Sequence, residues 1–276
     1  MEPLDAGLVA AGGLLAGAVN AVAGGGTLIA FPALLATGMP AFTANITSSV
    51  GLVTGYAGGA FGYRRELSGQ ADRLRALGVP ALLGGLTGAV ILLLTPADSF
   101  RAAVGYLVLA ACLLLAAQPW LARLVGRRRA AAALRSAVAG DSPRPDGSSG
   151  SSGTDTAGAV TWPTRVGVFL AGAYGSYFGA GLGVLLLGVL GILLPDDLQR
   201  TNAGKTLLSF GINAVGIAVF VASAQVSWAF ATILLVTSCV GGVMGARIAR
   251  LLPATALRAT VVTLGAVVAV LLIISI

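Results

Sequence analysis

One pattern occurs twice in this chain, as AGAVNAVAGGG at residues 16–26 and as AGAYGSYFGAG at residues 171–181. Each copy starts with Ala-Gly-Ala and ends in a G-x-G cluster inside an apolar run of about 30 residues. A straight helix of that length would measure about 45 Å, whereas the hydrocarbon core of a bilayer is about 30 Å thick. The glycines therefore predict a break or a re-entrant turn near the middle of each run.

The composition places the chain in a membrane. Charged residues make up 10% of the 276 positions and hydrophobic residues 57%, whereas a soluble domain carries about 25% charged residues. Several apolar runs are long enough to cross a bilayer. We expect an all-α, polytopic membrane protein, in which the net charge of +7 reports topology and not nucleic-acid binding.

The hydropathy pattern predicts eight apolar segments in two groups of four. The first repeat is expected at 1–122 and the second at 165–276, separated by a cytoplasmic linker at 123–164. That linker begins with a run of arginines that continues the fourth helix, and then becomes a Gly/Ser/Pro-rich stretch too polar to bury a core. The segment limits are 6–36, 42–62, 76–95, 101–122, 165–194, 202–224, 227–250 and 256–276.

The two groups are copies of one another. Adding 157 to positions 84–114 gives 241–271, and 13 of these 31 pairs are identical. Among the pairs are Gly84 with Gly241 and Arg101 with Arg258, and Asn45 pairs with Asn202 at the same offset. The sequence therefore predicts an internal duplication.

The arginines exchange sides between the copies. The loop between the second and third segments carries Arg64, Arg65, Arg73 and Arg75, while its counterpart at 223–228 carries none. The next loop carries only Arg101, while its counterpart carries Arg247, Arg250 and Arg258. Because basic loops stay cytoplasmic, we expect inverted repeats in which the first and fifth segments are re-entrant hairpins. Eight full spans in parallel repeats are the alternative.

The glycine breaks are the predicted substrate site. A half-helix that begins at a break directs free backbone N–H groups and a positive dipole end towards a ligand, and two such ends suit one small anion. For Gly84, Gly85 and Gly88 we expect helix packing instead. The substrate-binding candidates are Asn20, Gly24, Gly25, Gly26, Thr27, Asn45, Thr47, Ser48, Tyr177, Gly179, Gly181, Asn202, Lys205 and Thr206.

Lys205 is the only lysine in the chain, and it lies near the start of an apolar segment. A charge there is costly unless it serves a substrate or reaches the interface. The acids all fall in tails or loops, so no predicted span has a carboxylate in its interior. Proton pumps and many cation carriers place Asp or Glu at depth, so these classes lose support. The chain has no histidine and two isolated cysteines, and we predict no metal, cofactor or catalytic residue.

The run NAVAGGGTLIAFPALLATGMPAFTANITSSVGLVTGYAGGAFGYRREL, residues 20–67, resembles the opening of the TauE/SafE family of sulfite and organosulfonate exporters. Residues 170–220, with NAGKTLLSFGINAVG, look like the second-half copy of that family. The resemblance adds Asn213 to the site candidates and implies export or exchange of small, sulfur-containing anions. The second break reads GAGLG and not three glycines in a row, so the two half-sites are expected to differ.

The predicted function is a secondary carrier that moves a small anion outward across a bacterial plasma membrane. The membrane potential supplies about 2.3 kcal/mol per charge per 100 mV, so anion export needs no proton relay. An anion importer or channel is the alternative within transport, and an intramembrane enzyme is the alternative outside it. The expected partners are the anion and the lipid bilayer, with no nucleic acid, and the sequence predicts no particular oligomeric state.

Overall fold

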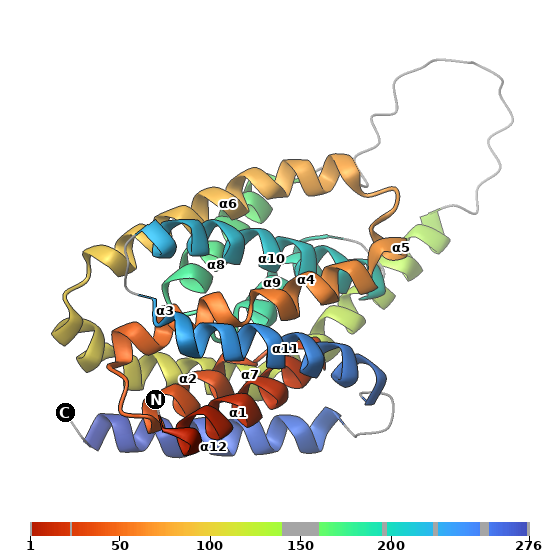
Figure 1. Cartoon of the computed structure of the whole chain (residues 1–276). Coiled ribbons are helices and arrows are strands. Elements are labelled where there is room, and N and C mark those ends of the chain that lie inside the picture. Colours follow the sequence, from red (N-terminus) through yellow and green to blue (C-terminus); the bar gives the residue numbers. More distant parts are fainter. Residues whose placement is uncertain are drawn as a thin grey trace, which may run out of the picture.

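The computed structural model describes residues 2–22, 24–139, 160–194, 198–222, 226–248 and 254–274, which form helices and no strand (Figure 1). The described chain is therefore an all-α membrane protein, as predicted. The first half contains α1 (Pro3–Val22), α2 (Thr27–Ala36), α3 (Ala41–Gly51), α4 (Val53–Gly62), α5 (Arg64–Leu67), α6 (Ala71–Leu94) and α7 (Ala97–Ala139). The second half contains α8 (Trp162–Tyr177), α9 (Leu182–Leu193), α10 (Leu198–Ala222), α11 (Trp228–Ile248) and α12 (Ala254–Ile274).

Both long apolar runs break at their glycines. The first run is split into α1 and α2, and the second into α8 and α9. At 10 and 12 residues, α2 and α9 are about 15 and 18 Å long, roughly half of the hydrocarbon thickness. Within the described residues, four longer helices are apolar enough to cross a membrane: Pro3–Asn20, Ala71–Leu94, Ala97–Leu121 and Arg200–Ala222.

Two predicted segments differ in detail from the helices observed. The second segment is divided into α3 and α4 at Leu52, whereas its duplicate is the uninterrupted α10. Just before this division, Gly51 lies so close to Leu234 of α11 that a Cβ would overlap the leucine side chain. The fourth segment continues as helix through the arginines to Ala139, and the predicted linker beyond it, at 140–159, lies outside the described residues.

The contacts between the halves are reciprocal. The first helix of each half packs along the third segment of the other, since α1 contacts α11 and α8 contacts α6. The last helices, α7 and α12, contact one another, and so do α4 and α10. Figure 1 shows that the matching helices α6 and α11 run in opposite directions, as do α7 and α12. Each half therefore completes its packing with elements of the other.

Glycines permit the two closest helix pairs. A Cβ on Gly17 of α1 would overlap the Ser238 carbonyl of α11, and a Cβ on Gly88 of α6 would overlap the Ala173 carbonyl of α8. Gly84 meets the Phe169 carbonyl in the same way. These contacts confirm the predicted packing role of the α6 glycines, because small residues let membrane helices approach one another closely.

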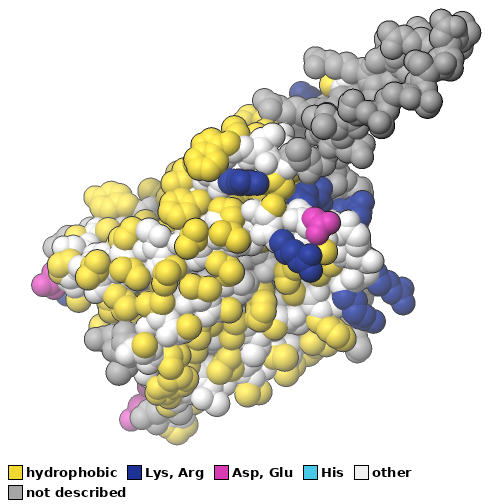
Figure 2. All heavy atoms as spheres, turned by 90° about the horizontal axis from the view of Figure 1, so that it is seen from above, with side chains coloured by type: hydrophobic (Ala, Val, Ile, Leu, Met, Phe, Trp, Pro, Cys, Tyr) yellow, Lys and Arg dark blue, Asp and Glu magenta, His cyan; other side chains and the backbone are white. Residues whose placement is uncertain are grey.

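The surface separates apolar and basic regions. Figure 2 shows a largely hydrophobic face, with Lys and Arg side chains gathered at one end. That end contains α5, the start of α6 and the end of the apolar part of α7 (Figure 1). Its described arginines include Arg64, Arg65, Arg73, Arg75, Arg123 and Arg127. We refer to it as the basic end.

Two glycines of α6 provide a matched test of the close packing. We expect Gly88→Ala to destabilise the protein by about 1–3 kcal/mol, because the new methyl group overlaps backbone of α8. Gly78→Ala should be neutral or slightly stabilising, because nothing lies within 4 Å of its Cβ position and alanine favours helix. Thermal unfolding of the purified variants in detergent measures both, and equal melting temperatures would contradict the packing role.

Candidate functional site

The two breaks use left-handed backbone that favours glycine. After α1 the chain turns at Gly24, with φ of 76°. After α8 it turns at Gly179 and Gly181, with φ of 77° and 83°. An L side chain is strained in this region of backbone space, so these positions need glycine for conformation alone.

The two breaks lie in contact with one another. A Cβ built on Gly24 would lie 3.4 Å from the Cα of Gly183, at the start of α9. A Cβ on Gly179 would lie 3.5 Å from Thr27 Oγ1 and 3.9 Å from Ser49 Oγ. The stretches 24–31 and 178–184 are buried throughout. The structure therefore brings both half-helix starts to one buried place.

Several buried amides at this place have no protein acceptor. The hydrogen-bond ladder of α2 starts with the N–H of Leu28, which donates to the Gly25 carbonyl at 3.1 Å. That of α9 starts with Leu182, which donates to the Gly179 carbonyl at 3.5 Å. Because buried N–H groups are almost always paired, the remaining donors fit a ligand or water. In the described residues these donors are the amides of Gly25, Gly26, Thr27, Ala180, Gly181 and Gly183.

Asn45 connects α3 to the second break. Its side chain is fully buried, and Nδ2 donates a 2.9 Å hydrogen bond to the carbonyl of Tyr177, the last residue of α8. Its Oδ1 has no hydrogen-bond donor. The Ser49 hydroxyl donates to the Asn45 carbonyl at 3.0 Å, which turns it towards the same break. Asn45 thus holds the end of α8 in place, while its Oδ1 remains a buried acceptor without a donor.

Three of the predicted site residues have structural partners instead. Thr47 Oγ1 accepts the Ser227 N–H at 3.2 Å, immediately before α11. The Ser48 hydroxyl donates to the Asn45 carbonyl of its own helix at 2.9 Å. The ring of Tyr177 packs edge-on against Phe100, at 6.0 Å between centroids. These side chains hold the surrounding helices in place.

Asn20 lies on the α1 side of the first break. Its side chain lies close to Tyr56 of α4, and its Oδ1 has no donor. Gly26 packs directly over it, because a Cβ there would lie 3.1 Å from the Asn20 Cβ and overlap the Ala16 carbonyl. Asn20 therefore supports the turn and retains an acceptor atom.

The α10 candidates form a second group. No residue of α10 is among the nearest neighbours that a Cβ would meet at Gly24, Gly25, Gly26, Gly179 or Gly181. The Thr206 hydroxyl donates to the Asn202 carbonyl at 2.8 Å, and Asn213 Nδ2 donates to the Ser209 carbonyl at 2.8 Å. Lys205 is half-buried and has no acidic partner among the described residues.

Ser209 was missed by the sequence reasoning. Its hydroxyl is buried and has no partner, and it lies between Lys205 and Asn213 at helical spacings of four residues. Such positions share one helix face. The spacing was visible in the sequence, so this polar face of α10 was predictable.

The arrangement therefore combines buried amide donors with one half-buried cation. Among the described carboxylates, Asp5, Asp72 and Asp98 lie in first turns of helices. Buried N–H donors together with a positive charge favour an anion.

Comparisons with known proteins point to a family of membrane transporters. The family model described as "Sulfite exporter TauE/SafE" matches residues 9–272. A "Probable membrane transporter protein" of Haemophilus influenzae is 25% identical over 250 residues, covering 91% of this chain and 87% of the relative. The "Probable membrane transporter protein YfcA" of Escherichia coli K12 is 25% identical over 249 residues, covering 90% and 82%. No solved structure matches the chain. The chain is a multi-pass membrane protein that belongs to the TauE/SafE family of membrane transporters.

Proposed function

We propose that this transporter is a secondary carrier that exports small oxyanions, with sulfite and organosulfonates as the substrate class, across the bacterial plasma membrane. The observation that carries the proposal is the meeting of two buried half-helix starts with unpartnered amides. Such amides bind anions because the helix dipole and the free N–H groups both favour negative charge. Sulfur oxyanions come from the resemblance to the family and from its name.

Lys205 is the proposed first contact for an anion that moves from the basic end towards the breaks. It lies on the second turn of α10, after Arg200 and Thr201, and thus in the half of the helix that is nearer the basic end. An anion that enters from that end would meet this ammonium before it reaches the amides. In an inside-negative cell the membrane potential then favours its exit.

The inverted arrangement is the proposed basis of alternation. Its support is the exchange of arginines between the copies, the opposite directions of α6 and α11 (Figure 1), and the reciprocal contacts of α1 with α11 and α8 with α6. Because Gly24 and Gly183 touch, a ligand between the breaks requires them to separate. Movement of one half against the other would open the site to each side in turn.

Asn45 and its duplicate suggest what changes between the two states. The positions that match Asn45 and Tyr177 in the other copy are Asn202 and Val22. In the described residues the Asn202 side chain makes no hydrogen bond. Val22 is nevertheless the last residue of α1, just as Tyr177 is the last residue of α8. We infer that the opposite state pairs Asn202 with the Val22 carbonyl and releases Asn45.

An importer or a channel for the same anions is the competing function within transport. Proteoliposomes separate the three: a carrier saturates with substrate and shows countertransport, and a channel does not. An intramembrane enzyme has less support, because membership of this transporter family favours transport.

Asn45 and Asn202 give a matched pair of variants. Asn45→Ala should lower the unfolding free energy by about 1–3 kcal/mol, because the buried Tyr177 carbonyl loses its donor. Asn202→Ala should leave the melting temperature unchanged and still slow transport, because its hydrogen bond forms in the other state. Thermal unfolding and proteoliposome flux measure the two effects. Normal flux in Asn202→Ala would refute the exchange.

Lys205→Ala should lower sulfite or organosulfonate flux at least tenfold, by about 1.4 kcal/mol or more, without loss of thermal stability. Lys205→Arg should retain part of the flux because it keeps the charge. Arg101→Ala is the control, since Arg101 is exposed at the start of α7. Flux through Lys205→Ala that equals wild type would remove this residue from the transport route.

A further inference from the structure

The second break is accompanied by an unpaired hydrogen-bond acceptor as well as by unpartnered amides. This acceptor is Oδ1 of Asn45, which has no donor among the described residues. The side chain is fully buried. Its carboxamide has a defined orientation, because the atom that faces the Tyr177 carbonyl at 2.9 Å has to be the donor Nδ2. The remaining atom is therefore an oxygen that lacks a partner.

Asn45 lies on the face of α3 that meets the second break. Ser49 is one helical turn further along, and its Oγ is 3.9 Å from the position that a Cβ would take on Gly179. Residues four apart share one face of a helix, so Asn45 is directed to the same side. Its Oδ1 belongs to the carboxamide that holds the Tyr177 carbonyl, two residues before Gly179. The acceptor therefore lies beside the break at which the Gly181 amide has no protein acceptor.

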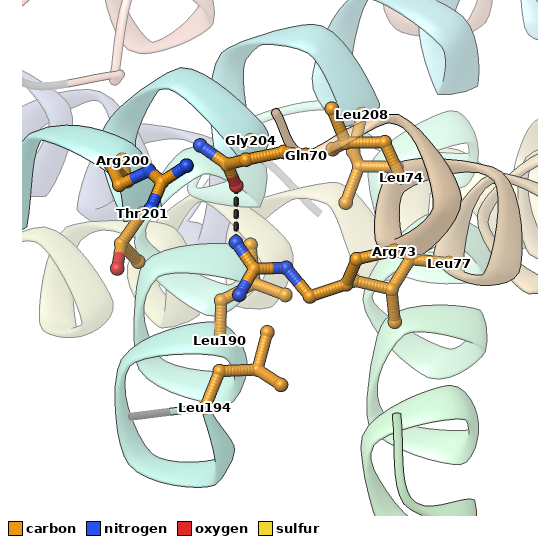
Figure 3. A pocket seen from close by; sticks show the side chains of 10 residues that line it. All are labelled: Gln70, Arg73, Leu74, Leu77, Leu190, Leu194, Arg200, Thr201, Gly204 and Leu208. Atoms are coloured by element: carbon orange, nitrogen blue, oxygen red, sulfur yellow. Dashed lines mark hydrogen bonds between the residues drawn. The ribbon is translucent and has the colours of Figure 1, made fainter. Parts of the chain in front are cut away.

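Gln70 shows how another buried carboxamide of this protein is satisfied. Gln70 is buried immediately before α6, and its Nε2 donates to the Glu66 carbonyl at 2.7 Å. Its Oε1 accepts a hydrogen bond from Arg73 (Figure 3). Buried polar side chains are normally paired in this way. Asn45 has the donor half of this arrangement and lacks the acceptor half.

The first break has a similar combination. Oδ1 of Asn20 is buried and has no donor in the part of the chain that the structure describes. Gly26, whose amide is one of the unpartnered donors, packs over this residue, since a Cβ on Gly26 would lie 3.1 Å from the Asn20 Cβ. Both breaks therefore place an acceptor next to their amide donors.

We propose that the substrate is a small anion that also carries a hydrogen-bond donor, and that the Asn45 oxygen accepts from this donor. The oxyanion end accepts hydrogen bonds from the amides of the breaks, and a hydroxyl group of the same molecule donates to Oδ1. A buried acceptor without a donor is costly, and a ligand that has no donor leaves this cost in place. Hydrogensulfite and hydroxyalkanesulfonates meet the requirement, whereas sulfate and simple alkanesulfonates do not. This specificity rests on the proposed function, because it concerns the ligand of the same site.

Hydroxyethanesulfonate and propanesulfonate test the donor requirement, because they have the same charge and size and differ in a hydroxyl against a methyl group. Binding is measured by thermal shift of the full chain in phosphatidylcholine nanodiscs, and flux in proteoliposomes. We expect wild type to bind hydroxyethanesulfonate about tenfold or more tighter, since a site that hydrogen-bonds a substrate hydroxyl rejects the analogue without it. Equal affinity and flux for the two sulfonates would overturn the donor requirement and leave anion transport intact. If wild type neither binds nor transports these sulfonates or sulfite, the proposed function fails together with it.

Asn45→Ala assigns the acceptor. This variant also frees the Tyr177 carbonyl, which weakens both ligands, so the quantity to compare is the ratio of the two affinities. We expect the preference for hydroxyethanesulfonate to fall to about threefold or less, because coupling between the hydroxyl and Asn45 is lost. Thr87→Ala is the control and should keep the wild-type ratio, since Thr87 is exposed on α6 and its hydroxyl donates to the Leu83 carbonyl of the same helix at 2.8 Å.

A preference that persists unchanged in Asn45→Ala would show that another group receives the hydroxyl, and would overturn the assignment to Asn45. The wild-type comparison of the two sulfonates stays decisive for the donor requirement even where Asn45→Ala does not fold.

Discussion

Hydrocarbon offers no hydrogen-bond partner, and this constraint governs the whole molecule. Each buried backbone group in a membrane must find a partner inside the protein, which is why the described chain is helical throughout. The exceptions are the two breaks, where buried amides of residues such as Gly25 and Gly181 have no protein acceptor. Unpaired donors there are costly. An anion that accepts hydrogen bonds from these amides would remove this cost. The glycine breaks that interrupt the helices therefore form the proposed site.

The packing of the two halves explains how the two glycine breaks come together at one place. Neither α2 nor α9 is long enough to cross the bilayer, and each relies on the other half for cover. Gly17 lets α1 lie directly on a carbonyl of α11, and Gly88 lets α6 lie directly on a carbonyl of α8. This close fit positions the breaks against one another. The halves differ locally, because α3 and α4 are separated at Leu52 and α10 is continuous. That difference is what two copies in different states of one cycle would show.

Much of this was predictable from the sequence, and the remainder depends on tertiary contacts. Apolar runs too long for the bilayer, with glycines near their middles, were sufficient to predict the helices and the two breaks. The partners of side chains were not predictable, because Thr47 caps the start of α11 and Asn45 reaches across the chain to Tyr177. Lys205 stood out as a single charge, but its distance from the breaks depends on how α10 packs.

The inverted arrangement is tested most directly by the accessibility of two matching turns. In a chain with Cys112 and Cys239 replaced by serine, single cysteines replace Ser68 beside α6 or Trp228 at the start of α11, both of which are exposed. A membrane-impermeant thiol reagent is then added to intact cells and to opened cells. Inverted halves predict that the cysteine at position 228 reacts in intact cells and that the one at position 68 reacts only after opening. Labelling of both from the same side would show that the halves are parallel, and the meeting of the breaks would then need another explanation.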